Sequence, residues 1–174
     1  MADSHVIQLA AEISGSHFTA IETAVGVARQ ASVDVSRCRI DIVRDAGAVS
    51  VVFTPPASAT APEAARVFAV EWGRGDSAPS YSGFANHGTK TGEVLAALQG
   101  EHYLPMEAAA KLFRRRMPSF SPYRITLMRE GRSWVATFTR APSPLEPHGG
   151  IGGPGFEVEM NVSDLRTVRA NFIR

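Results

Sequence analysis

The feature that most constrains the fold of this chain is an internal repeat with an offset of 85 residues. Residues 37–54 (RCRIDIVRDAGAVSVVFT) align without gaps with residues 122–139 (PYRITLMREGRSWVATFT). Five of these 18 positions are identical, among them Phe53 with Phe138. Self-similarity at a fixed spacing indicates duplicated structural units, so we expect the two halves to share one fold.

Two further blocks support the repeat. The segment 22–29 matches the segment 107–114 at three positions with the same offset. Residues 67–72 (VFAVEW) match residues 155–160 (GFEVEM) at an offset of 88. The change of offset predicts a loop that is three residues longer in the second copy.

Each copy begins with helical periodicity. In the first copy, apolar residues recur at helical spacing over 18–28, and Thr19 with Glu22 fits a capping box. In the second copy, the same spacing extends over 104–113, and Pro105 suits a first helical turn. Alternating residues then predict strands at 38–43, 49–53, 67–72, 123–127, 134–138, 155–160 and 167–173, with a weaker equivalent of the last strand near Glu93.

This pattern predicts the fold class α+β. We expect two tandem repeats, 1–95 and 96–174, each with one helix packed on an antiparallel meander sheet. Units of this size bury a small fraction of their surface when they are alone. The two repeats are therefore expected to form one compact unit.

A helix followed by an antiparallel meander resembles the cystatin-like fold. The ends of the copies, FEVEMNVSDLRTVRANFIR (156–174) and VFAVEW (67–72) with TKTGEVL (89–95), also resemble small PepSY-type modules. The segment 73–88 departs from that pattern. The resemblance implies an inhibitor or another binding module, an analogy that rests on fold alone.

The motifs that commonly carry catalysis or cofactors are missing or lie in the wrong context. The loop 148–155 (HGGIGGPG) matches G-x-G-x-x-G, but it lacks a preceding strand and a following helix. The chain has neither a G-x-S-x-G elbow nor an H-E-x-x-H pair. Its single cysteine, Cys38, lies on an apolar strand face and is interpreted as a small buried hydrophobe. We therefore predict no catalytic residues, no metal site and no cofactor.

Charge is distributed unevenly along the chain. Residues 101–174 carry 11 basic and 7 acidic side chains, although the net charge of the whole chain is only +1. Exposed aromatic residues are not interleaved with the arginines, so nucleic acid is not the expected partner. A solvated helix face remains an alternative. The predicted partner-binding cations are Lys111, Arg114, Arg115, Arg129 and Arg132.

Two long loops occupy corresponding places in the two copies, at 54–66 and 139–155. Both exceed the two to five residues that a hairpin needs. Long loops on a rigid sheet often carry binding, although a tolerated insertion explains them equally well. In the second loop, His148 and Ile151 are added to the predicted partner-binding residues.

The sequence thus predicts a non-enzymatic protein-binding module, in the form of an inhibitor or a toxin-neutralising immunity protein. An NTF2-like or cystatin-like pocket protein that binds or transforms a small ligand is the first alternative, and a structural dimerisation module is the second. A pocket between helix and sheet with converging polar groups would favour the first alternative. The expected partner is another protein, perhaps better described as an acidic one, with homodimerisation left open. No secretory signal or membrane-spanning run is visible, so a cytoplasmic location is expected.

Overall fold

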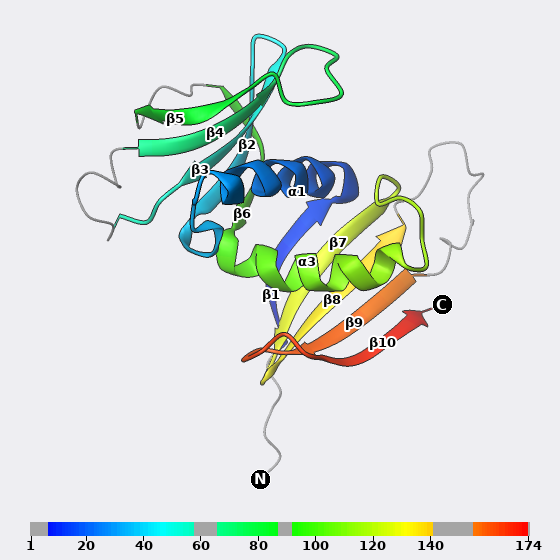
Figure 1. Cartoon of the computed structure of the whole chain (residues 1–174). Helices are drawn as coiled ribbons and strands as arrows, with labels where there is room; N and C mark the ends of the chain where they lie inside the picture. Colours follow the sequence, from blue (N-terminus) through cyan, green and yellow to red (C-terminus); the bar gives the residue numbers. More distant parts are fainter. Residues whose placement is uncertain (1–6, 58–65, 87–91, 141–154, 174) are drawn as a thin grey trace. The chain divides into compact units, whose positions relative to one another are not determined.

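The computed structural model describes residues 7–57, 66–86, 92–140 and 155–173, and has an α+β fold with two antiparallel sheets (Figure 1). The chain forms two compact units. Unit 1 comprises Met1–Phe18 and Leu104–Arg174, and unit 2 comprises Thr19–Tyr103. Each unit contains one five-stranded sheet.

The sheet of unit 1 combines the first strand of the chain with four strands from its C-terminal part. Every neighbouring pair in it is antiparallel. In spatial order, the strands are β1 (Ile7–Ser14), β7 (Tyr123–Glu130), β8 (Ser133–Arg140), β9 (Gly155–Asn161) and β10 (Thr167–Ile173).

The sheet of unit 2 has the corresponding order when it is read from its other edge. Its pairs are also antiparallel. From that edge, the strands are β6 (Glu93–Gln99), β2 (Arg39–Asp45), β3 (Ala48–Thr54), β4 (Arg66–Trp72) and β5 (Tyr81–Asn86).

Two α-helices and one short 3₁₀ helix complete the described structure. Helix α1 (Gly15–Gln30) lies against the sheet of unit 2, and helix α3 (Gly100–Arg114) lies against the sheet of unit 1 (Figure 1). The 3₁₀ helix η1 (Val35–Arg37) leads into β2. A helix that covers one sheet face explains why strand residues alternate between buried and exposed positions.

An aromatic cluster centred on Phe113 of α3 forms the core of unit 1. The Phe113 ring stacks on Phe138 at a centroid distance of 4.4 Å and on Phe120 at 5.1 Å. It also meets Tyr123 and Phe156 edge-on, at 4.9 and 5.9 Å. These contacts fix the helix on the sheet through large apolar surfaces.

The core of unit 2 is mainly aliphatic. The inward positions expected from alternation in β2 and β3 are almost fully buried, and so is the apolar stripe of α1. The sequence pattern therefore identified these core residues correctly: Ile21, Ala24, Val25 and Ala28 of the helix, and Ile40, Ile42, Val51 and Phe53 of the strands.

The expected helix starts were wrong. Helix α1 begins at Gly15, so Thr19 lies inside it, and the Ser14 hydroxyl is the cap that accepts a hydrogen bond from the His17 N–H at 3.2 Å. Helix α3 begins at Gly100, which places Pro105 inside the helix and beyond its first turn. Periodicity missed both starts because the first turn of each helix lies before the apolar stripe that was counted.

Two strands were not expected, and one was misplaced. β1 and β5 were not predicted, although each is an edge strand of a five-stranded sheet. The strand near Glu93 exists as β6, but it pairs with β2 and is not the equivalent of β10. The strand that occupies the position of β10 in unit 2 is β5, which pairs with β4.

The bounds of the units also differ from the expected division at residues 95 and 96. β1 pairs with β7 over Ile7–Ser14, which joins the N-terminal segment to unit 1. β6 pairs with β2, which joins residues 93–99 to unit 2. Backbone pairing over these strands outweighs proximity along the chain in deciding which unit each strand belongs to.

Candidate functional site

The C-terminal turn of α3 carries three consecutive arginines. Cations at this position interact favourably with the helix dipole. The Arg114 guanidinium lies 4.5 Å from the centroid of the Phe120 ring. The Arg116 guanidinium lies 5.9 Å from the Phe156 ring and 5.7 Å from the Phe172 ring. Two of the three cations are therefore held over aromatic faces of the unit 1 core.

A fourth arginine belongs to the same end of unit 1. Arg140 ends β8 and is paired in register with Tyr123, whose N–H donates a hydrogen bond to the Phe120 carbonyl at 2.7 Å. Arg114 covers the ring of that same Phe120. We call the four residues Arg114, Arg115, Arg116 and Arg140 the cationic end.

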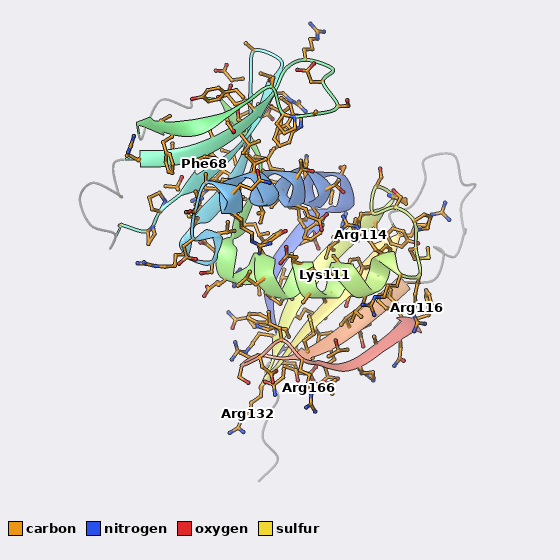
Figure 2. The ribbon with its side chains drawn as sticks, viewed as in Figure 1. Phe68, Lys111, Arg114, Arg116, Arg132 and Arg166 are labelled. Atoms are coloured by element: carbon orange, nitrogen blue, oxygen red, sulfur yellow. The ribbon has the colours of Figure 1, made fainter. Side chains whose placement is uncertain are left out.

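The cationic end is accessible and rich in uncompensated charge. All four of its arginines are exposed. Arg115, Arg116 and Arg140 form no ion pair with any residue that the structure describes. Lys111, one helical turn earlier, is exposed and lies 3.9 Å from the Glu107 carboxylate. The predicted cations Lys111, Arg114 and Arg115 therefore lie on one helix segment (Figure 2).

The other two predicted cations lie at the opposite end of the sheet. Arg129 and Arg132 flank the turn that follows β7, whereas Tyr123, at the start of that strand, adjoins the cationic end. Eight residues of strand rising about 3.3 Å each separate the two ends by roughly 23 Å. Figure 2 shows Arg132 near Arg166 and away from Arg114.

Arg129 is also engaged locally. Its guanidinium lies 5.0 Å from the Trp134 ring, and its Nε donates a hydrogen bond to the Gly131 carbonyl at 3.1 Å. The predicted partner-binding set thus divides into two groups. His148 and Ile151 lie outside the described residues.

The cationic end includes two arginines that the sequence analysis did not select. Arg116 falls within the apolar arc on a helical wheel, and Arg140 is 24 residues farther along the chain. The signal for Arg116 was available, because it continues a run of three arginines. The signal for Arg140 lies only in the pairing of β8 with β7.

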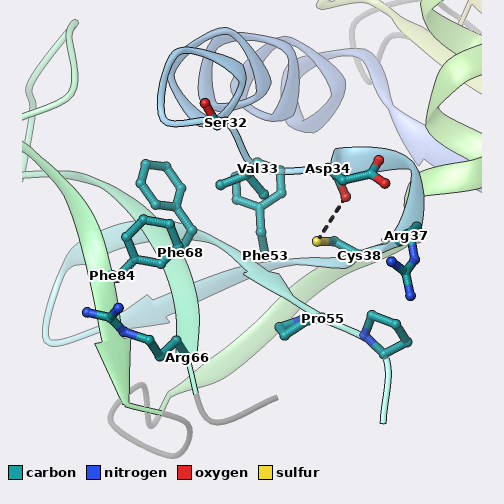
Figure 3. Close-up of a pocket in the computed structure, with 11 residues that line it drawn as sticks. Ser32, Val33, Asp34, Arg37, Cys38, Phe53, Pro55, Arg66, Phe68 and Phe84 are labelled. Carbon is teal, nitrogen blue, oxygen red and sulfur yellow. Dashed lines mark hydrogen bonds between the residues drawn. The ribbon is translucent and has the colours of Figure 1, made fainter. Parts of the chain in front are cut away.

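Unit 2 contains a cavity of about 410 Å³ (Figure 3). Its walls come from the connection between α1 and η1, the start of β2, the end of β3, and strands β4 and β5. Three phenylalanines, Phe53, Phe68 and Phe84, and two arginines, Arg37 and Arg66, are among its lining residues. None of these residues was selected as a binding residue from the sequence.

Cys38 also lines this cavity. Burial of the Cys38 side chain raises the pKa of its thiol, and the nearby Asp34 carboxylate adds to the increase. The Sγ atom lies 3.4 Å from the Asp34 carbonyl oxygen, as its hydrogen-bond donor. A protonated, hydrogen-bonded thiol is a poor nucleophile, so the geometry agrees with a structural role for Cys38.

The described parts of the chain contain no group of three or more His, Cys, Asp or Glu side chains placed to hold a metal ion. Neither of the described helices is both long and apolar enough to cross a membrane.

Comparisons with protein-family models, with curated proteins and with solved structures gave no match for this chain. The cystatin-like and PepSY-like resemblance therefore stays a prediction.

Proposed function

We propose that this protein is a non-enzymatic protein-binding module that docks on an acidic surface of its partner through the cationic end. The observation that carries the proposal is the convergence of four exposed arginines from α3 and β8 at one end of unit 1. An acidic surface complements this charge and would be steered toward it during association.

The aromatic contacts support a role in recognition. Arg114 and Arg116 are held over rings of the core, so less side-chain freedom remains to be lost when they bind. A guanidinium presents its donors in a planar fork that matches a carboxylate. Glutamate and aspartate side chains of a protein fit these groups directly.

The same geometry argues against single-stranded nucleic acid as the partner. Phe120 and Phe156, the rings beneath the arginines, are 4% and 1% exposed. Rings that are buried in this way offer no platform for stacked bases. Acidic protein is therefore the partner that we propose.

We further propose that the chain consists of two repeats that have exchanged their first strands. The offset of 85 residues relates Gly15 to Gly100 and Val35 to Phe120. A Cβ on Gly15 would collide with the Phe120 carbonyl, and a Cβ on Gly100 would collide with the Val35 carbonyl. The same close contact at equivalent places supports a duplicated unit.

The strand orders support the exchange. β1, which precedes α1, pairs with β7, and β6, which precedes α3, pairs with β2. Each helix is thus preceded by a strand that belongs to the sheet of the other unit. The inhibitor or immunity role stays a prediction, because it depends on the identity of the partner.

The docking proposal can be tested with a fluorescent peptide of alternating Asp and Glu residues as the probe. We expect the double variant Arg115→Glu/Arg140→Glu to weaken binding at low salt by at least about tenfold, mainly by slowing association. Added salt should weaken binding to the unchanged protein, because exposed charges are screened beyond about 10 Å at 0.1 M ionic strength. Stopped-flow fluorescence measures both rates.

The control is Arg132→Glu/Arg166→Glu, which makes the same change of net charge at the far end of the unit 1 sheet. It should retain most of the binding. Equal losses in the two double variants would mean that general attraction, and not the cationic end, binds the probe. Tighter binding of a single-stranded oligonucleotide than of the acidic peptide would also overturn the proposal.

A further inference from the structure

The cavity of unit 2 has an aromatic floor built across three strands. Phe53, Phe68 and Phe84 face one another directly in the registers of β3, β4 and β5. The ring centroids of Phe53 and Phe68 are 6.2 Å apart, and those of Phe68 and Phe84 are 5.1 Å apart. Aromatic pairs at these distances form a continuous apolar surface.

One end of this floor reaches solvent. Phe53 and Phe68 are 1% and 4% exposed, whereas Phe84 on the edge strand is 49% exposed. Val33 and Pro55 add apolar walls to the cavity (Figure 3). An exposed ring at the mouth of an apolar cavity is costly in water, and a ligand that covers it would gain hydrophobic free energy.

Arginines lie at both ends of the cavity. The Arg66 guanidinium lies 5.3 Å from the centroid of the Phe84 ring, and Arg37 lies at the other end, beside Asp34 (Figure 3). Neither arginine forms an ion pair with a residue that the structure describes. Because Asp34 offsets Arg37, Arg66 is the cation whose charge is available to a ligand.

We infer that this cavity binds a small organic carboxylate whose aromatic or aliphatic body covers the phenylalanine floor while its carboxylate meets Arg66. The volume of about 410 Å³ suits such a molecule, since small-molecule sites range from about 300 to 1,000 Å³. The arrangement places an apolar surface and a cation side by side, which selects a ligand with both properties. This site is independent of the cationic end of unit 1.

The carboxylate requirement can be tested with two probes of nearly equal shape, 4-phenylbutyrate and its neutral amide, 4-phenylbutanamide. Titration of the ¹⁵N-labelled full-length protein, followed by NMR, should give saturable shifts at residues around the cavity, including Val33 and Phe84. We expect the carboxylate to bind about tenfold more tightly than the amide, because its hydrogen bonds to Arg66 are charge-assisted.

Three variants separate the two parts of the site. Arg66→Gln should remove the preference for the carboxylate and leave amide binding unchanged. Phe84→Ala, at a half-exposed position that tolerates truncation, should weaken both probes. Arg132→Gln in unit 1 is the control and should change neither affinity.

The inference is overturned by equal binding of the carboxylate and the amide to the unchanged protein. It is also overturned if the shifts map outside the cavity, or if neither probe saturates at millimolar concentration. Spectra of each variant that retain the dispersion of the unchanged protein show that a lost affinity does not come from unfolding.

Discussion

At the scale of single residues, burial decides the chemistry of Cys38. The side chain is 6% exposed and packs at the start of β2. Removing the thiolate from water costs more than removing the neutral thiol, so the proton is held more tightly than in the unfolded chain. The ordinary thiol pKa of 9.0 is therefore raised in the folded protein.

This shift predicts a loss of stability at alkaline pH. The unfolded thiol releases its proton near pH 9 while the folded thiol keeps it, so the free energy of unfolding should fall as pH rises above that value. Urea unfolding between pH 7.5 and 10 should show a steeper fall for the unchanged protein than for Cys38→Ala. Parallel pH profiles would contradict the assignment.

At the scale of elements, the start of α1 depends on a glycine and a cap. Ser14 caps the first turn, and Gly15 lies so close to the Phe120 carbonyl that no Cβ fits between them. The connection from α3 to β7, which contains Phe120, is thereby held against the first turn of α1. This contact lies within unit 1.

Gly15→Ala should therefore destabilise the protein by about 1–3 kcal/mol, the usual range for overpacking that shifts backbone. Gly26→Ala is the matched control in the same helix. Gly26 is exposed, and a Cβ there would meet no atom within 4 Å. That substitution should stabilise the protein by about 0.5–1 kcal/mol, because alanine loses less backbone entropy in a helix. Thermal melts of the two variants that shift in the same direction would contradict this account.

At the scale of the whole molecule, the placement of β1 and β6 determines which sheet each strand stabilises. Ile13 of β1 is 4% exposed and pairs with Ile125, and Leu98 of β6 is 3% exposed and pairs with Ile40. Ile13 and Leu98 are related by the 85-residue offset, as are Ile40 and Ile125. Each strand therefore contributes an equivalent apolar residue to the unit in which it pairs.

Truncation of these two residues should have separate effects. Ile13→Ala and Leu98→Ala should each cost about 2–5 kcal/mol. Native-state hydrogen exchange should show the larger loss of protection in β7 for Ile13→Ala and in β2 for Leu98→Ala. A larger loss in β2 for Ile13→Ala would contradict the exchange of first strands.

Local patterns in the sequence were sufficient for most elements and for the core. Helical spacing and strand alternation depend on neighbouring residues, so they identified the buried stripe of α1 and the inward faces of β2, β3, β7 and β8. The last strand, 167–173, was placed correctly for the same reason. The helix starts were missed because a single cap such as Ser14 is a weak signal.

The candidate sites could be predicted only in part. Lys111, Arg114 and Arg115 are close in sequence, and the structure keeps them on one helix segment. Arg129 and Arg132 were grouped with them because sequence distance gave no sign that a whole strand intervenes. Phe53, Phe68 and Phe84 come together only through the registers of β3, β4 and β5.

By itself, the sequence determined the α+β class, the order of most elements, the core residues and the 85-residue offset that relates the two halves. Only the tertiary structure decided which sheet receives each edge strand, where the cationic end lies, and that unit 2 contains a cavity. The physical reason is the range of the interactions. Periodicity reports contacts between near neighbours, whereas backbone pairing joins β1 to β7 across more than a hundred residues and leaves no local trace in either strand.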